Sequence, residues 1–184
     1  ITIGEYDVPY SINTMGETTT EICNRTFYHS EIEDDEKYTH YMCCNDDFVF
    51  HTIGWDYSLL EIIAINGGWG IAHCKNGMNE KLPMTSVISK NILECTGWLQ
   101  LETLTHLCGD LVWRDIGQGI NKLHYKNDVY IEHQHYTSNK SEFDATYEKT
   151  NSNTMYRLDG NVYREWRKNG LPRIVEVIKE QMQK

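Results

Sequence analysis

Acidic residues interrupt a stretch whose other residues are typical of a β-strand. The stretch reads YMCCNDDFVF, and Asn45, Asp46 and Asp47 stand in its middle. Strand interiors are depleted in Asp and Asn, and carboxylates that are removed from water need a partner or a metal ion. Asp46 and Asp47 offer the hard oxygen ligands that Mg²⁺ and Mn²⁺ prefer. A bound cation is therefore the simplest explanation, and a turn or a helix cap is the other one.

Two histidines could complete such a metal site. The segment 123–131 alternates as a strand does, and His133 and His135 continue the parity of its apolar residues. Both imidazoles would then project to the same side, just past the end of a strand. Mn²⁺ accepts an imidazole beside carboxylates, and a diphosphate would supply further oxygen ligands. A structural or a fully exposed histidine is the alternative at either position.

A third carboxylate stands where it could accept a proton. Asp110 directly precedes LVWRDIGQGI, in which apolar residues recur every fourth position as in a helix. A carboxylate near a transferred group can serve as general base while it remains ionised. The ordinary role of an Asp at this place is a helix N-cap.

Composition limits the classes of protein to consider. The chain has 184 residues, enough for a single domain with one core, and a formal net charge of -10. This charge argues against a generally basic nucleic-acid surface. No apolar run approaches the roughly eighteen residues of a membrane span, and no signal peptide opens the sequence. The six cysteines form no C-x-x-C motif, so we expect free thiols in a reducing cytoplasm.

Strands and helices are expected to alternate along the chain. We predict an α/β domain with helices packed on a mixed sheet, whose ligand crevice lies beyond the carboxyl ends of the strands. The run Glu31–Lys37 is expected to be a solvated loop or a helix end. The predicted strands are 38–44, 69–74 and 123–131, and the predicted helices are 55–65, a helix capped by Thr85 or Ser86 and ended by Gly97, a helix that begins near Asp110, and 172–182.

Several motifs together resemble those of GT-A-fold, family 2-like glycosyltransferases. The resemblance runs from about Tyr38 to Asn151 and implies a single domain over 1–184, with a GT-A-like mixed sheet that carries helices on both faces. Residues 1–37 are not assigned by it, and 152–184 would form a helical tail. The motifs are NDDF, GWD, LPMTSVISKNILECTGWL, HLCGDLVWRDIG, LHYKNDVYIEHQHY and the K-x-x-x-D-x-x-Y pattern of residues 140–147.

The resemblance implies binding of a nucleoside-diphosphate-sugar through Mn²⁺ or Mg²⁺ at a DXD-type motif, which residues 45–47 match. Asp47 would bind the metal ion directly, and Asp46 would support it or hold hydroxyl groups of the donor. Asn45 would belong to the same donor-binding motif. His133 or His135 would complete the metal site.

The resemblance implies roles for two further residues, one in catalysis and one in binding the diphosphate. In the resemblance Asp110 takes the position of the catalytic base, which implies single displacement with inversion. Lys140 would reach the diphosphate as a mobile point charge.

Other interpretations remain open at the level of the sequence. The β-α-β unit with which such enzymes usually open is not recognisable in residues 1–30, so a degenerate GT-A-like domain that binds a nucleotide or a partner protein is the second hypothesis. A metal-dependent hydrolase is the third. The acceptor could be a glycan, a small molecule or a modified nucleic-acid base. The abundance of Asn, Lys and Tyr would suit a bacteriophage protein, which would act in the host cytoplasm.

Overall fold

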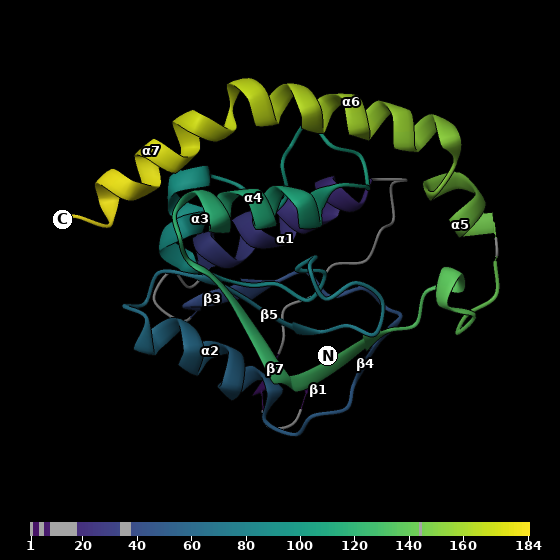
Figure 1. Cartoon of the computed structure of the whole chain (residues 1–184), viewed down its shortest axis with the longest axis horizontal. Helices are drawn as coiled ribbons and strands as arrows, with labels where there is room; N and C mark the ends of the chain where they lie inside the picture. The colour runs from purple at the N-terminus through teal and green to yellow at the C-terminus, as the bar shows by residue number, and fades with distance from the viewer. Residues whose placement is uncertain (1, 4–5, 8–17, 34–37, 144) are drawn as a thin grey trace.

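A mixed five-stranded sheet lies at the centre of the molecule (Figure 1). The computed structural model describes residues 2–3, 6–7, 18–33, 38–143 and 145–184. The parallel pair β5–β7 is flanked by antiparallel neighbours, so the carboxyl ends of β3, β5 and β7 share one edge with the amino ends of β4 and β6. In spatial order the strands are β3 (His40–Met42), β6 (Val87–Ser89), β5 (Ile71–Lys75), β7 (Leu123–His133) and β4 (Phe48–Phe50).

Helices cover both faces of this sheet (Figure 1). Helix α2 packs against β5, β6 and β7 on one face, whereas α3 and α4 pack on the other and carry α6 and α7. A short pair of strands, β1 (Thr2–Ile3) and β2 (Tyr6–Asp7), is separate from the main sheet. The helices are α1 (Thr19–Glu33), α2 (Trp55–Ile65), α3 (Lys90–Thr96), α4 (Gly109–Gly119), the 3₁₀ turn η1 (Tyr136–Ser138), α5 (Ala145–Thr150), α6 (Asn153–Asn169) and α7 (Leu171–Gln181).

The apolar residues of the central strands divide between two cores. Ile71 and Ile88 belong to the cluster beneath α3 and α4, whereas their chain neighbours Ala72 and Val87 belong to the cluster beneath α2. Successive side chains of a strand point to opposite faces, so a strand that is buried on both faces reads as a continuous apolar run. The expected α/β domain with helices on a mixed sheet is therefore confirmed, while its GT-A character stays a prediction.

Most local predictions are confirmed, and one helix start is wrong. The helix predicted over 55–65 is α2, and Gly97 ends α3 with φ 77°. The helix said to be capped by Thr85 or Ser86 begins only at Lys90, because the residues between them form β6. Pairing with β3 and β5 on either side decides this, and such packing overrides an ambiguous apolar spacing.

The two ends of the chain contain helices that integrate into the domain. The region 1–37, unassigned from the sequence, contains α1, which includes Glu31–Glu33 as its end; residues 34–37 lie outside the described part. The predicted tail consists of α6 and α7, whose Tyr163 and Ile178 are buried in the core that contains α3 and α4. The tail is therefore part of the domain core.

A buried carboxylate attaches α6 to α4. Asp115 of α4 is 4% exposed and accepts hydrogen bonds from Tyr163 Oη at 2.6 Å and Arg114 Nη2 at 2.8 Å. Arg167 Nε lies 2.7 Å from Oδ2 of Asp115, the oxygen that Tyr163 also contacts. Two cations and a phenol thus surround one carboxylate. A buried charge of this kind is retained only when it is paired and hydrogen-bonded.

None of the helices in the described part of the chain is long and apolar enough to cross a bilayer.

Candidate functional site

A cavity of about 810 Å³ lies at the sheet edge where β3 and β7 end. Open α/β sheets bind their ligands at this kind of edge. A smaller cavity of about 360 Å³ along α1 contains none of the site residues predicted from the sequence. The larger cavity is lined by Thr19, Thr20, residues 43–47, Pro83, Met84, Ser86, Gln100, residues 106–110, Trp113, His133, His135, Ser141, Glu142, Tyr147, Thr150 and Asn151.

Asp47 and His133 meet in this cavity. Strand β4 runs antiparallel to β7 with Phe48 opposite His133, and the backbone N–H of Gln134 donates to the carbonyl of Asp47 at 2.9 Å. The residue before β4 is thereby placed beside the last residue of β7. The Oδ2 atom of Asp47 lies 3.1 Å from Nε2 of His133. The two residues that the sequence places at separate strand ends are thus neighbours in the structure.

A phenol contacts the same carboxylate. The Tyr147 hydroxyl, from α5, donates to Oδ2 of Asp47 at 3.0 Å. Burial raises the pKa of Asp47, but the hydrogen bonds and charge of His133 and then the bond from Tyr147 outweigh it, so that its pKa lies below the usual range. The other oxygen, Oδ1, is buried and has no hydrogen-bond partner among the residues that the structure describes. Asp47 is therefore held ionised with one oxygen unused.

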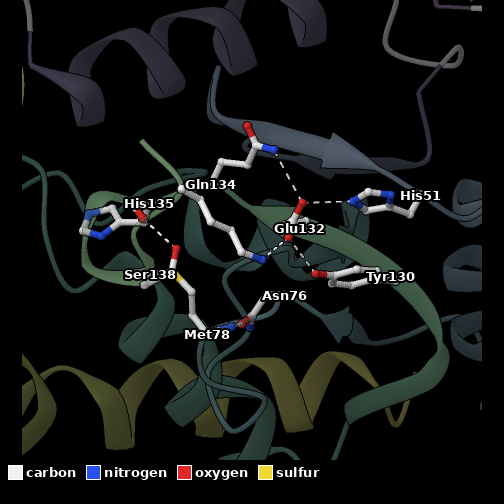
Figure 2. Close-up of polar contacts among 9 residues, drawn as sticks. His51, Asn76, Met78, Tyr130, Glu132, Gln134, His135 and Ser138 are labelled. Atoms are coloured by element: carbon white, nitrogen blue, oxygen red, sulfur yellow. Dashed lines mark hydrogen bonds and ion pairs between the residues drawn. The ribbon is translucent and has the colours of Figure 1, made fainter. Parts of the chain in front are cut away.

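His135 also lines the cavity, but its ring has other contacts. The ring centroids of His133 and His135 are 5.3 Å apart. Nδ1 of His135 lies 2.9 Å from the Thr137 hydroxyl, and its carbonyl accepts a hydrogen bond from Ser138 at 2.6 Å (Figure 2). Burial, followed by repulsion from His133, lowers the pKa of His135. Of the two predicted histidines, His133 is the one that contacts Asp47.

Asp110 reaches the same cavity from the first turn of α4. Its Oδ1 accepts a hydrogen bond from the backbone N–H of Leu111 at 2.8 Å. Burial raises the pKa of Asp110, and the Leu111 hydrogen bond and the charge of Arg114 only partly oppose this. A carboxylate with a raised pKa beside a cavity is a candidate for proton transfer.

Asn45 and Asp46 are exposed residues of the cavity lining, whereas Lys140 lies elsewhere. The Lys140 ammonium pairs with Glu132, and Lys140 is absent from the described lining of the cavity. Glu132 alternates with His133 along β7, so its side chain points to the other face of the strand. Lys140 thus forms an ion pair outside the cavity, and its contact with a diphosphate stays a prediction.

Glu132 is the centre of a polar cluster (Figure 2). Its carboxylate contacts Nε2 of His51 at 3.1 Å, and it accepts hydrogen bonds from the Tyr130 hydroxyl at 2.9 Å and from Gln134 at 3.5 Å. The contact with Lys140, followed by those with His51 and Tyr130, lowers the pKa of Glu132 to about 2.

This depressed pKa predicts how stability depends on pH. Glu132 stabilises the fold above its ordinary pKa of 4.5, and that contribution is lost as the pH falls towards 2. We therefore expect the wild type to lose more free energy of unfolding between pH 6 and pH 3 than Glu132→Gln does. Urea denaturation at both pH values measures this difference. Glu61→Gln, on the exposed side of α2, is the control, and equal losses for wild type and Glu132→Gln would contradict the prediction.

His106 was not identified from the sequence. It lines the cavity from the irregular segment before α4, and its Nδ1 lies 2.6 Å from the Thr19 hydroxyl at the start of α1. Burial lowers its pKa, with partial opposition from Asp159. The periodic patterns that identify helices and strands do not extend to such a loop. The signal that could have identified His106 is its position in the motif HLCGD, four residues before Asp110.

The cavity lining is acidic. The lining that the structure describes includes Asp46, Asp47, Asp110 and Glu142, and it includes no Lys or Arg. An anionic ligand in this cavity would need a cation to offset its charge.

Two side chains of the cavity could act as ligands of a metal ion. No group of three or more His, Cys, Asp or Glu residues that could hold a metal ion is found in the described part of the chain. Asp47 offers a buried oxygen that has no partner in the described part of the chain, and His133 offers an imidazole beside it. Mg²⁺ is commonly held by one or two carboxylates together with substrate phosphates and water, and Mn²⁺ tolerates an imidazole. The pair therefore fits an ion that is shared with a phosphate-bearing substrate.

All site residues predicted from the sequence except Lys140 line this one cavity. Comparisons with models of protein families, with curated proteins and with solved structures found no match to this chain. Its function is therefore inferred from the residues and the cavity described above.

Proposed function

We propose that the protein is a metal-dependent glycosyltransferase that moves a sugar from a nucleoside-diphosphate-sugar to an acceptor hydroxyl with inversion. The observation that carries the proposal is the 3.1 Å contact between Asp47 and His133 in the cavity that also contains Asp110. A pair of metal donors and a separate carboxylate of raised pKa are what such a transfer requires.

Asp47 and His133 would hold Mn²⁺ or Mg²⁺, and the Tyr147 hydroxyl would keep its hydrogen bond to Asp47. The ion, when bound, supplies charge compensation for the leaving diphosphate. Asn45 and Asp46 are exposed in the cavity lining, and in this proposal they would bind hydroxyl groups of the donor. Because the described lining contains no Lys or Arg, donor binding should depend on the divalent ion.

Asp110 would act as the general base. Its carboxylate takes the proton of the acceptor hydroxyl as the acceptor oxygen bonds to the anomeric carbon, and the bond from that carbon to the diphosphate breaks. A pKa raised by burial brings the base closer to the working pH and makes it a better proton acceptor. Direct attack by the acceptor hydroxyl with Asp110 as base would be a single displacement, which inverts the anomeric centre.

The acidic lining also bears on the acceptor. With four carboxylates in the cavity and a formal net charge of -10 on the chain, a polyanion such as nucleic acid would be repelled. An uncharged acceptor, such as the hydroxyl of a glycan or a small molecule, fits this charge distribution better.

A nucleotide screen tests the proposal directly. We expect UDP, GDP or dTDP to raise the melting temperature only when Mn²⁺ is present, because binding to the folded state stabilises it by mass action. The matching nucleotide-sugar should then be hydrolysed slowly, or transferred when an acceptor is supplied. Mn²⁺-dependent binding without either reaction would favour a nucleotide-binding domain, and no nucleotide binding under any of these conditions would contradict the proposal.

A further inference from the structure

A buried carboxylate on α6 holds the loop that leads to Asp110. Asp159 is 1% exposed and accepts three backbone hydrogen bonds from consecutive residues of that loop. Its Oδ1 accepts from Thr105 at 3.0 Å, and its Oδ2 accepts from His106 at 2.9 Å and Leu107 at 2.7 Å. Hydrogen bonds to an ionised acceptor are about twice as strong as neutral ones. The three amides are thus fixed to one point of α6.

The loop needs such support because its backbone is strained where it enters α4. Cys108, the residue before α4, has φ 70° and ψ 3°, a left-handed conformation that side chains other than Gly, Asn or Asp rarely adopt. Strained residues of this kind persist only when the surrounding structure holds them.

The same loop carries two side chains of the candidate site. His106 lines the cavity directly, and Asp110 follows the strained Cys108 by two residues. A displacement of the amides at 105–107 would therefore move both side chains relative to Asp47 and His133, which are held separately by β4 and β7.

We propose that Asp159 is a positioning residue that sets where Asp110 and His106 stand in the cavity. The inference rests on the proposed function, because it assigns Asp159 a part in preparing the general base. It also gives the helical tail a role in the site, since α6 lies beyond the segment 38–151 that resembles glycosyltransferases.

Asp159→Asn is the test, and Asp115→Asn is its matched control. An amide has only one acceptor oxygen, so Asn at 159 places an NH₂ group against backbone N–H donors and breaks part of the anchor. Asp115 is equally a buried carboxylate of the α4–α6 contact, but it bonds side chains rather than the loop. Both variants weaken helix packing, and only Asp159→Asn releases the loop.

Three readouts distinguish positioning from a purely structural role. For Asp159→Asn we expect faster hydrogen exchange at the amides of 105–107 and a kcat of transfer about 100-fold lower, with the Mn²⁺-dependent Kd for UDP within about threefold. Asp115→Asn should leave all three near wild type.

The outcomes separate this inference from the proposed function. Unchanged exchange at 105–107, or an equal rise of that exchange in both variants, would overturn the role of Asp159 whether or not the protein transfers sugars. A wild type without transfer activity would count against the proposed function, while the exchange data would still show whether Asp159 holds the loop. If Asp159→Asn does not fold, Asp159→Glu keeps the charge and shifts it by one methylene, and the same readouts apply.

Discussion

Asp110→Asn is expected to abolish sugar transfer while donor binding persists. The amide oxygen of Asn can still accept the hydrogen bond from Leu111 N–H, so the first turn of α4 should keep its geometry. The amide cannot accept the acceptor's proton, and loss of a general base typically costs about 10²–10⁴-fold in rate. Steady-state transfer assays give the change in kcat, and calorimetry with UDP and Mn²⁺ gives the Kd.

The pH profile provides an independent check on Asp110. Burial raises the pKa of Asp110, so the wild-type rate should fall on the acidic side as this carboxylate becomes protonated. The residual activity of Asp110→Asn should lack that acidic limb. Full turnover by the variant, or an unchanged acidic limb, would refute the assignment of the base.

Asp47→Asn is expected to remove metal-dependent nucleotide binding. The substitution removes the negative charge beside His133 and one of the two carboxylate oxygens of Asp47, while the side chain keeps its size. Loss of a partner behind a metal ligand already costs about 10–100-fold in metal affinity, so loss of a ligand should cost about 100-fold or more. Titration of Mn²⁺ in the presence of UDP measures this affinity.

Asp46→Asn is the matched control for Asp47→Asn. It removes the same charge from the adjacent residue, which lines the cavity but is exposed and makes no contact with His133 that the structure describes. If general charge in the cavity were the only factor, both variants would lose Mn²⁺ affinity equally. That result, or wild-type affinity in Asp47→Asn, would rule out Asp47 as a specific ligand.

The sequence by itself determined the elements whose signals are local. Helical spacing with a glycine stop located α2, and Gly97 located the end of α3. The position of Asp110 at the start of α4 and that of Asp47 and His133 at strand ends followed from the same patterns. These features depend on residues within a few positions of each other, and so they can be read along the chain.

Only the tertiary structure decided which distant side chains meet. The pairing of β4 with β7 selects His133 as the neighbour of Asp47, and it turns Glu132 to the other face, where Lys140 pairs with it. The bond from Tyr147 to Asp47 joins residues a hundred positions apart, so no local pattern could predict it.

Contacts between distant residues also decide the structure of β6 and of the loop before α4. Residues 87–89 form a strand because β3 and β5 offer hydrogen-bond partners on both sides, which a helical spacing of apolar residues does not reveal. The backbone at 105–107 is held by a carboxylate from α6, more than fifty residues further along the chain. Residue types and local order thus supplied the candidate chemistry, and long-range strand pairing and burial decided its geometry.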